Sequence, residues 1–180
     1  MTIFLDRDGV INRKRPEGDY VKSWEEFEFL PGALEGLCLL SAGASRLIVV
    51  TNQRGIARGR MSERDLTDIH RKMLAAIRQA GGRIDAIYYC PHEGACECRK
   101  PRSGLFLRAK ADFPEIEFTD STLVGDAIAD LEAAFRLGCR AVLVAGPDRE
   151  KEILEQARQK GLPVNLSVLS LLEFSRTGLA

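Results

Sequence analysis

Short apolar runs alternate along the chain with longer segments of helical periodicity. The apolar runs predict strands over residues 3–5, 47–51, 84–89, 122–124 and 141–144. The periodic segments predict helices over residues 31–42, 62–80, 104–113, 128–137 and 149–159, with a last short helix within 166–174. Such alternation favours right-handed βαβ units. We therefore expect an α/β fold of the Rossmann-like three-layer type, in which helices cover both faces of a parallel sheet.

The segment over residues 62–80 carries clear signals for both ends of a helix. Ser62 stands three residues before Asp65, which resembles a capping box with Asp in place of Glu or Gln. An apolar stripe follows on one helical face, and Gly81-Gly82 come directly after it. We expect this helix to begin next to Ser62 and to end at the glycine pair.

Polar clusters follow three of the expected strands. They are Asp6-Arg7-Asp8-Gly9, Thr51-Asn52-Gln53 and Gly125-Asp126. In a parallel α/β sheet, ligands bind beyond the carboxyl ends of the strands. The clusters are distant in sequence, but we expect them to meet at that edge of the sheet.

The acids in these clusters suit phosphoryl transfer. Asp6 and Asp8 are two residues apart, so in an extended chain their side chains point the same way. Together with Asp126 they offer the dense oxygen ligands that Mg²⁺ prefers. One carboxylate can attack phosphorus, a second can act as acid and base, and Lys100 can supply a fixed cation. Each residue alone is also compatible with a turn, a helix cap or, for Lys100, a solvated charge, so the prediction rests on their combination.

Four segments, in order, resemble the four motifs of the haloacid-dehalogenase-like (HAD-like) phosphatases. They are Phe4–Asn12, Val50–Gln53, Arg99–Pro101 and Val124–Asp126. Within that superfamily the chain is most similar to the D-glycero-D-manno-heptose 1,7-bisphosphate 7-phosphatases, a group related to the histidinol-phosphate phosphatases. The similarity runs from about Thr2 to Val144. It implies a HAD-like fold without a large cap domain.

The resemblance also implies a role for each matching residue. Asp6 would be the nucleophile and a Mg²⁺ ligand, and Asp8 the acid and base, with its backbone carbonyl on the metal. Asp126 would complete the protein's ligands to Mg²⁺. The phosphate would be held by Thr51, Asn52 and Lys100. The implied reaction is hydrolysis of the heptose 7-phosphate through an aspartyl-phosphate, and its product would serve synthesis of a bacterial surface glycan such as lipopolysaccharide.

A cysteine cluster precedes Lys100. The pattern C-x-H-x₃-C-x-C places Cys90, His92, Cys96 and Cys98 within residues 90–98. Tetrahedral Zn²⁺ takes such ligand sets, so we expect a closed structural zinc loop, with free thiols or iron–sulfur ligation as the alternatives. Zinc there would fix the loop that leads to Lys100. The heptose phosphatase group carries a similar loop. We expect the other two cysteines, Cys38 and Cys139, to pack in the core.

The substrate signals are mixed. The segment 51–59 resembles the heptose branch, whereas the three-residue spacing between His92 and Cys96 is nearer to the histidinol phosphatases, which remain the alternative. A bisphosphate would need a cation for its unreacted phosphate, and Arg99 is our first candidate. Arg54, Arg58 and the run 13–15 are others, although each is also compatible with a solvated surface charge. Gln53 could bind a sugar hydroxyl or support its own loop.

Length and charge limit the remaining classes of function. The 180 residues fit one domain over 1–180, and 45% hydrophobic residues fit a soluble globular protein. Equal totals of 26 basic and 26 acidic residues argue against a nucleic-acid partner. We expect no membrane partner, no secretory signal, a cytoplasmic location and a monomer that acts on a small-molecule sugar bisphosphate. A non-catalytic phosphate-binding module should have lost Asp6 or Asp8, and both are present.

Overall fold

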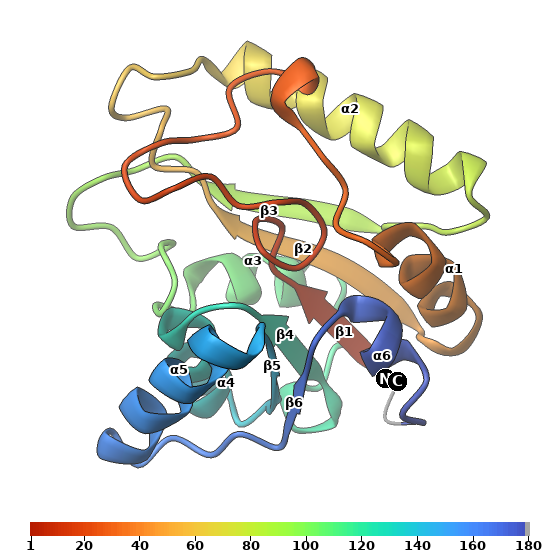
Figure 1. Ribbon diagram of the computed structural model, residues 1–180, viewed down its shortest axis with the longest axis vertical. Coiled ribbons are helices and arrows are strands. Elements are labelled where there is room, and N and C mark those ends of the chain that lie inside the picture. The colour runs from red at the N-terminus through yellow and green to blue at the C-terminus, as the bar shows by residue number, and fades with distance from the viewer. Residues whose placement is uncertain (179–180) are drawn as a thin grey trace.

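Six parallel strands form the centre of the molecule in the order β3-β2-β1-β4-β5-β6 (Figure 1). The computed structural model describes residues 1–178. The strands are β1 (Thr2–Leu5), β2 (Arg46–Asn52), β3 (Ala86–Cys90), β4 (Thr122–Gly125), β5 (Arg140–Val144) and β6 (Leu166–Val168). All neighbouring pairs are parallel. The predicted parallel sheet is therefore confirmed. The chain winds outward from β1 in one direction and from β4 in the other, so the crevice at the reversal of strand order lies between these two strands.

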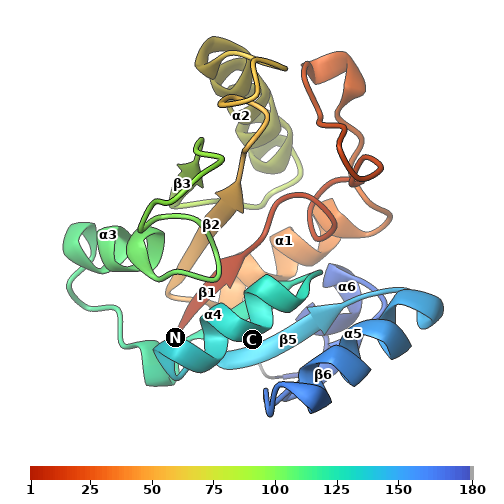
Figure 2. The same cartoon turned by 90° about the vertical axis from the view of Figure 1, so that its left-hand side faces the viewer.

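Helices cover both faces of this sheet (Figures 1 and 2). One face packs against α1 (Ala33–Gly43), α2 (Glu63–Gln79) and α6 (Leu171–Ser175). The other packs against α3 (Gly104–Asp112), α4 (Ile128–Leu137) and α5 (Pro147–Gln159). Two short 3₁₀ helices, η1 (Trp24–Glu26) and η2 (Phe118–Asp120), lie in the connections. The predicted three-layer α/β class is confirmed.

The two hydrophobic cores follow from the side-chain alternation of the strands. Ile3 and Leu5 of β1 join the core beneath α1, α2 and α6, whereas Phe4 between them joins the opposite core. Phe4 is fully buried and meets the ring of Phe106 from α3 edge-to-face, with centroids 5.2 Å apart. Both faces of β1 are thus buried, and its carboxyl end is held rigidly in the middle of the fold.

The expected capping box at the start of α2 is present. The Ser62 hydroxyl accepts a hydrogen bond from the backbone N–H of Asp65 at 3.1 Å, and the Asp65 carboxylate accepts one from the backbone N–H of Ser62 at 2.8 Å. These bonds satisfy two donors that the first helical turn would otherwise leave unpaired.

The short helix predicted within 166–174 is present as α6, but the strand that precedes it was not predicted. Residues 166–168 form β6, which pairs with β5, and α6 begins only after Ser170, whose side chain accepts from the backbone N–H of Glu173 at 3.1 Å. The exposed edge of β5 offers backbone partners to residues 166–168, and this pairing is not visible in the local pattern. Smaller shifts move β3 to 86–90 and α1 to 33–43. No helix in residues 1–178 is long and apolar enough to cross a membrane.

Candidate active site

Three buried aspartates meet at the crevice between β1 and β4. Asp6 follows β1, Asp126 follows β4, and Asp130 lies in the first turn of α4. Each offers a carboxylate oxygen, and these oxygens all lie within 4.8 Å of one another. The structure therefore brings together the two acids that the sequence placed at different strand ends, and it adds a third. Oxygen ligands at this density fit a Mg²⁺ ion.

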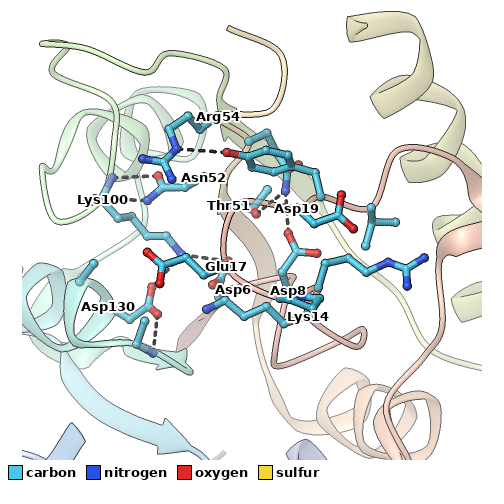
Figure 3. A pocket seen from close by; sticks show the side chains of 18 of the residues that line it. Asp6, Asp8, Lys14, Glu17, Asp19, Thr51, Asn52, Arg54, Lys100 and Asp130 are labelled. Atoms are coloured by element: carbon cyan, nitrogen blue, oxygen red, sulfur yellow. Dashed lines mark hydrogen bonds and ion pairs between the residues drawn. The ribbon is translucent and has the colours of Figure 1, made fainter. Parts of the chain in front are cut away.

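Lys100 is fixed between two of these acids. Its Nζ lies 3.0 Å from Oδ1 of Asp6 and 2.7 Å from Oδ1 of Asp130 (Figure 3). Burial raises the pKa of Asp6 to about 7, although the Lys100 cation opposes that rise. The paired acids raise the pKa of Lys100 despite its burial, so its ammonium stays charged. Asp130 was missed by sequence reasoning, although its position four residues after Asp126, one turn into a helix, is a signal that could have found it.

Asp8 belongs to a second, separate network. Nη2 of Arg7 donates to both of its carboxylate oxygens at 3.0 Å, Asn12 Nδ2 donates at 2.9 Å and Gln53 Nε2 at 2.8 Å. Burial alone would raise the pKa of Asp8, but the Arg7 cation and these hydrogen bonds lower it. The side chain of Asp8 is thus not part of the three-acid cluster, although it lines the same cavity, and it is held in one orientation.

The segment after β2 supports both networks. Asn52 Oδ1 accepts from the backbone N–H of Lys100 at 3.0 Å, and Asn52 Nδ2 donates to the Lys100 carbonyl at 3.2 Å. Gln53 Nε2 donates to Thr51 Oγ1 at 3.0 Å as well as to Asp8. Asn52 therefore fixes the backbone that carries Lys100. The amide nitrogen of Gln53 is already bonded within the protein, which favours the loop-supporting interpretation of this residue.

Two cations contact the carboxylate of Asp126. Lys14 Nζ lies 2.9 and 3.1 Å from its two oxygens, and Arg149 Nη1 lies 3.1 Å from one of them. Arg149, in the first turn of α5, was not among the predicted residues. Gly9 packs against the same carboxylate with a φ of 97°, and a Cβ added at Gly9 would collide with Oδ2 of Asp126. Only glycine fits this position, for reasons of both space and backbone conformation.

A cavity of about 820 Å³ opens above these side chains (Figure 3). Residues 14–21 form one wall, and Arg54 and Arg99 stand at other positions of the lining. Arg54 Nε donates to the hydroxyl of Tyr20 at 3.2 Å, which joins two walls. Of the cations suggested for a second phosphate, Lys14, Arg15, Arg54 and Arg99 line the cavity. The other two do not: Arg13 pairs with Glu28, and Arg58 with Glu93.

The Cys/His cluster also converges. The ligand atoms of Cys90, His92, Cys96 and Cys98 all lie within 4.8 Å of one another, and the Cys98 sulfur is 3.0 Å from that of Cys90 and 3.1 Å from Nδ1 of His92. Ligands about 2.3 Å from a tetrahedral ion would lie about 3.8 Å apart, so small movements would complete a zinc site. Cys139 is buried as expected, whereas Cys38 is partly exposed, so the core prediction was wrong for Cys38.

The parallel sheet, the Asp6-x-Asp8 pair after its central strand, and the Lys100–Asp130 pair beside it define a hydrolase of the HAD-like class. A HAD-hydrolase-like family model matches residues 97–169. The D-glycero-alpha-D-manno-heptose-1,7-bisphosphate 7-phosphatase of Mycobacterium tuberculosis is 44% identical over 151 residues, which cover 80% of this chain and 79% of that protein. The beta-anomer enzyme of Neisseria meningitidis is 37% identical over 177 residues, 97% of this chain and 92% of that protein.

The solved structures agree with these relatives. The D,D-heptose 1,7-bisphosphate phosphatase of Bordetella bronchiseptica, complexed with magnesium and phosphate, superposes with a TM-score of 0.88 at 35% identity, over 99% of this chain and 97% of that one. This chain belongs to the heptose 1,7-bisphosphate phosphatase family of HAD-like hydrolases. The predicted family and the predicted enzyme class, a magnesium-dependent phosphomonoester hydrolase, are thereby confirmed.

Proposed function

We propose that this enzyme removes the 7-phosphate from D-glycero-D-manno-heptose 1,7-bisphosphate. The observation that carries the proposal is the position of Asp6: its carboxylate stands at the end of the central strand, 3.0 Å from the Lys100 ammonium, at the base of a cavity with cationic walls. A sugar that carries two negatively charged phosphate groups matches those walls in charge. The relatives named above support this sugar over histidinol phosphate, which remains the alternative.

In the proposed mechanism, a carboxylate oxygen of Asp6 attacks the phosphorus at O7. The bond from phosphorus to the sugar oxygen breaks as Asp8 gives a proton to that oxygen. Because its contacts lower the pKa of Asp8, this carboxylate must first take up that proton when the substrate phosphate binds. Asp8, now ionised, then takes a proton from a water molecule, and the resulting hydroxide displaces phosphate from Asp6. Asp8 is suited to both steps because Arg7, Asn12 and Gln53 fix its orientation. Thr51, Asn52 and Lys100 would hold the transferring phosphate.

The residues present fit a Mg²⁺ ion. Asp6, Asp126 and Asp130 gather three carboxylates into one small volume, and the backbone carbonyl of Asp8 would be a further ligand. When bound, Mg²⁺ would neutralise charge on the phosphoryl group in transfer. Lys14 and Arg149, which now pair with Asp126, are the side chains that would have to share that carboxylate with the ion.

We also propose a structural Zn²⁺ on Cys90, His92, Cys96 and Cys98. The convergence of three sulfur atoms and one imidazole nitrogen supports it. The ion would stabilise the loop that ends at Arg99 and Lys100. Arg99 is our first candidate for the second phosphate, because it lines the cavity next to Lys100.

Two further parts of the proposal concern the protein as a whole. Residues 1–180 would act as one domain and as a monomer. A cytoplasmic location fits a substrate of this kind and a cluster of reduced thiols. The heptose product would enter the synthesis of a bacterial surface glycan.

A substrate panel tests the proposal. We expect kcat/KM for the heptose bisphosphate to exceed that for histidinol phosphate by at least about 100-fold, because a site built for several polar groups rejects substrates that leave them unpaired. The panel should include both anomers at carbon 1. Similar kcat/KM values for the two compounds would refute the proposed specificity, and size-exclusion chromatography would test the monomer.

A further inference from the structure

A fully buried arginine lies behind the proposed acid–base residue. Arg7 has no exposed surface, and it is not part of the cavity lining. Its Nη2 donates to both carboxylate oxygens of Asp8, while its Nη1 lies 3.2 Å from Nε2 of His70 on α2. Arg7 therefore contacts Asp8 from the protein interior and cannot touch a substrate.

The hydrogen-bond chemistry of this chain of contacts is determined by Arg7. An arginine N–H can only donate, so Nε2 of His70 must accept, and the ring is neutral with its proton on Nδ1. Burial, together with the Arg7 cation, lowers the pKa of His70 to about 3, consistent with a neutral ring. The ring is 8% exposed and packs edge-on to Tyr89 with centroids 6.2 Å apart, so it has little freedom to turn.

The orientation of the Asp8 carboxylate is what this arrangement restrains. A short aspartate side chain has two free torsions, and its productive use requires one oxygen to point at the leaving group. Nη2 of Arg7 donates to both oxygens, while Asn12 and Gln53 donate to one oxygen each, so Arg7 is the charged member of the set that fixes the carboxylate. The contact with His70 fixes one arm of the guanidinium in turn.

We propose that Arg7 and His70 are positioning residues, which orient the Asp8 carboxylate for proton transfer to the leaving oxygen. The proposal rests on the assignment of Asp8 as acid and base in the proposed function. The competing explanation is that the Arg7–His70 contact serves only folding. A positioning role and a role in folding predict different effects on activity. Poor orientation of Asp8 should slow only the reactions in which the departing oxygen needs a proton.

Leaving groups of different basicity separate these explanations. The parameter kcat/KM reports the steps up to cleavage of the first phosphorus–oxygen bond; an alkyl phosphate such as a hexose 6-phosphate needs a proton in that step, whereas p-nitrophenyl phosphate does not. We expect His70→Leu to lower kcat/KM by about 10-fold or more on the alkyl phosphate, a part of the full acid–base effect, and by less than about 2-fold on the aryl phosphate. His70→Gln, which keeps an acceptor for Arg7, should restore the alkyl activity.

Two controls complete the design. Asp8→Asn should show a larger loss of kcat/KM on the alkyl phosphate than His70→Leu does, again with little loss on the aryl phosphate. Met73→Leu, a volume-conserving change at another buried position of α2, should leave the ratio of kcat/KM for the two substrates unchanged. Equal losses on both substrates, or no loss on the alkyl phosphate, would overturn the proposal.

A failure to fold does not leave the proposal untested. If His70→Leu yields no folded protein, Arg7→Lys, which keeps the charge but loses the planar fork, must show the same selectivity. The experiment also stands apart from the substrate assignment. A wild-type enzyme that hydrolyses hexose 6-phosphate but not the heptose bisphosphate would refute the proposed substrate and still allow the leaving-group comparison.

Discussion

The ammonium of Lys100 lies 2.7 Å from Oδ1 of Asp130, and only 2% and 3% of the two side chains are exposed. A pair this deeply buried is expensive to break, because the remaining partner keeps a charge that water cannot reach. The pair therefore connects the loop after residue 98 to the first turn of α4, at the centre of the proposed site.

Replacing one member of this pair should cost stability. We expect Asp130→Asn to lower the free energy of unfolding by about 3 kcal/mol, measured by urea titration in EDTA. The matched control is Glu132→Gln on the same helix, which removes a partly exposed pair with Lys160 and should cost at most about 1 kcal/mol. Equal costs for both variants would contradict the argument from burial.

Loss of the proposed nucleophile, Asp6, should abolish turnover. Asp6→Asn keeps the shape of the side chain but removes the attacking oxygen anion, so we expect kcat to fall by at least about a thousandfold in a phosphate-release assay. The circular dichroism spectrum should be unchanged. Asp120→Asn, at an exposed position in η2, serves as a control and should keep full activity. Retained turnover in Asp6→Asn would exclude the covalent route.

The lack of space at Gly9 leads to a second stability prediction. In Gly9→Ala the new methyl group would collide with the Asp126 carboxylate and occupy a φ of 97°, so we expect a loss of about 3 kcal/mol together with weaker Mg²⁺ binding by calorimetry. Gly18 has a φ of 86° but nothing within 4 Å of an added Cβ. Gly18→Ala should therefore cost only about 1 to 2 kcal/mol and leave Mg²⁺ binding intact.

Disruption of the cysteine cluster should release zinc without preventing magnesium binding by the aspartates. We expect Cys96→Ser to reduce zinc content in elemental analysis from one equivalent per chain and to lower Tm, while magnesium binding persists. Activity should fall because the cluster leads into the loop that Asn52 bonds through the Lys100 backbone. Cys38→Ser, outside the cluster, should retain zinc. An unchanged zinc content in Cys96→Ser would argue against the closed site.

His70 predicts a dependence of stability on pH. Its pKa of about 3 in the folded protein lies below the ordinary value of 6.5, so between these values the unfolded chain binds more protons than the folded one. The stabilisation is thus complete above pH 6.5 and is lost as pH falls toward 3. From pH 6.5 to 5 we expect wild type to lose about 2 kcal/mol relative to His70→Gln, in urea titrations of the metal-free protein. The raised pKa of Asp6 makes its own contribution to stability change with pH in the opposite direction. Asp6 is present in both wild type and His70→Gln, so that contribution cancels in the difference between them. Parallel stability curves would show that the pKa of His70 is the same in the folded and unfolded chain, and would contradict the prediction.

The sequence revealed the parts of this fold that depend on local chemistry. Ser62 and Asp65 marked a helix start because the two residues of a capping box are close in sequence. Acids after apolar runs indicated the catalytic edge because parallel strands place their ends together. Arg149 and His70 could not be predicted from the local sequence. Arg149 contacts Asp126, which is 23 positions away, and His70 contacts Arg7, which is 63 positions away. Residues 166–168 became a strand because a distant neighbour offered backbone hydrogen bonds.

An uninterrupted stretch of the chain, residues 14–21, supplies one wall of the cavity, whereas the proposed metal ligands Asp6 and Asp126 follow buried strands. Lys14 is the residue of that wall that pairs with Asp126. Exchange of residues 15–21 between homologues, with Lys14 kept, should therefore change which sugar is admitted without altering the acids beneath, so chimeras offer a direct route to new selectivity on the same scaffold.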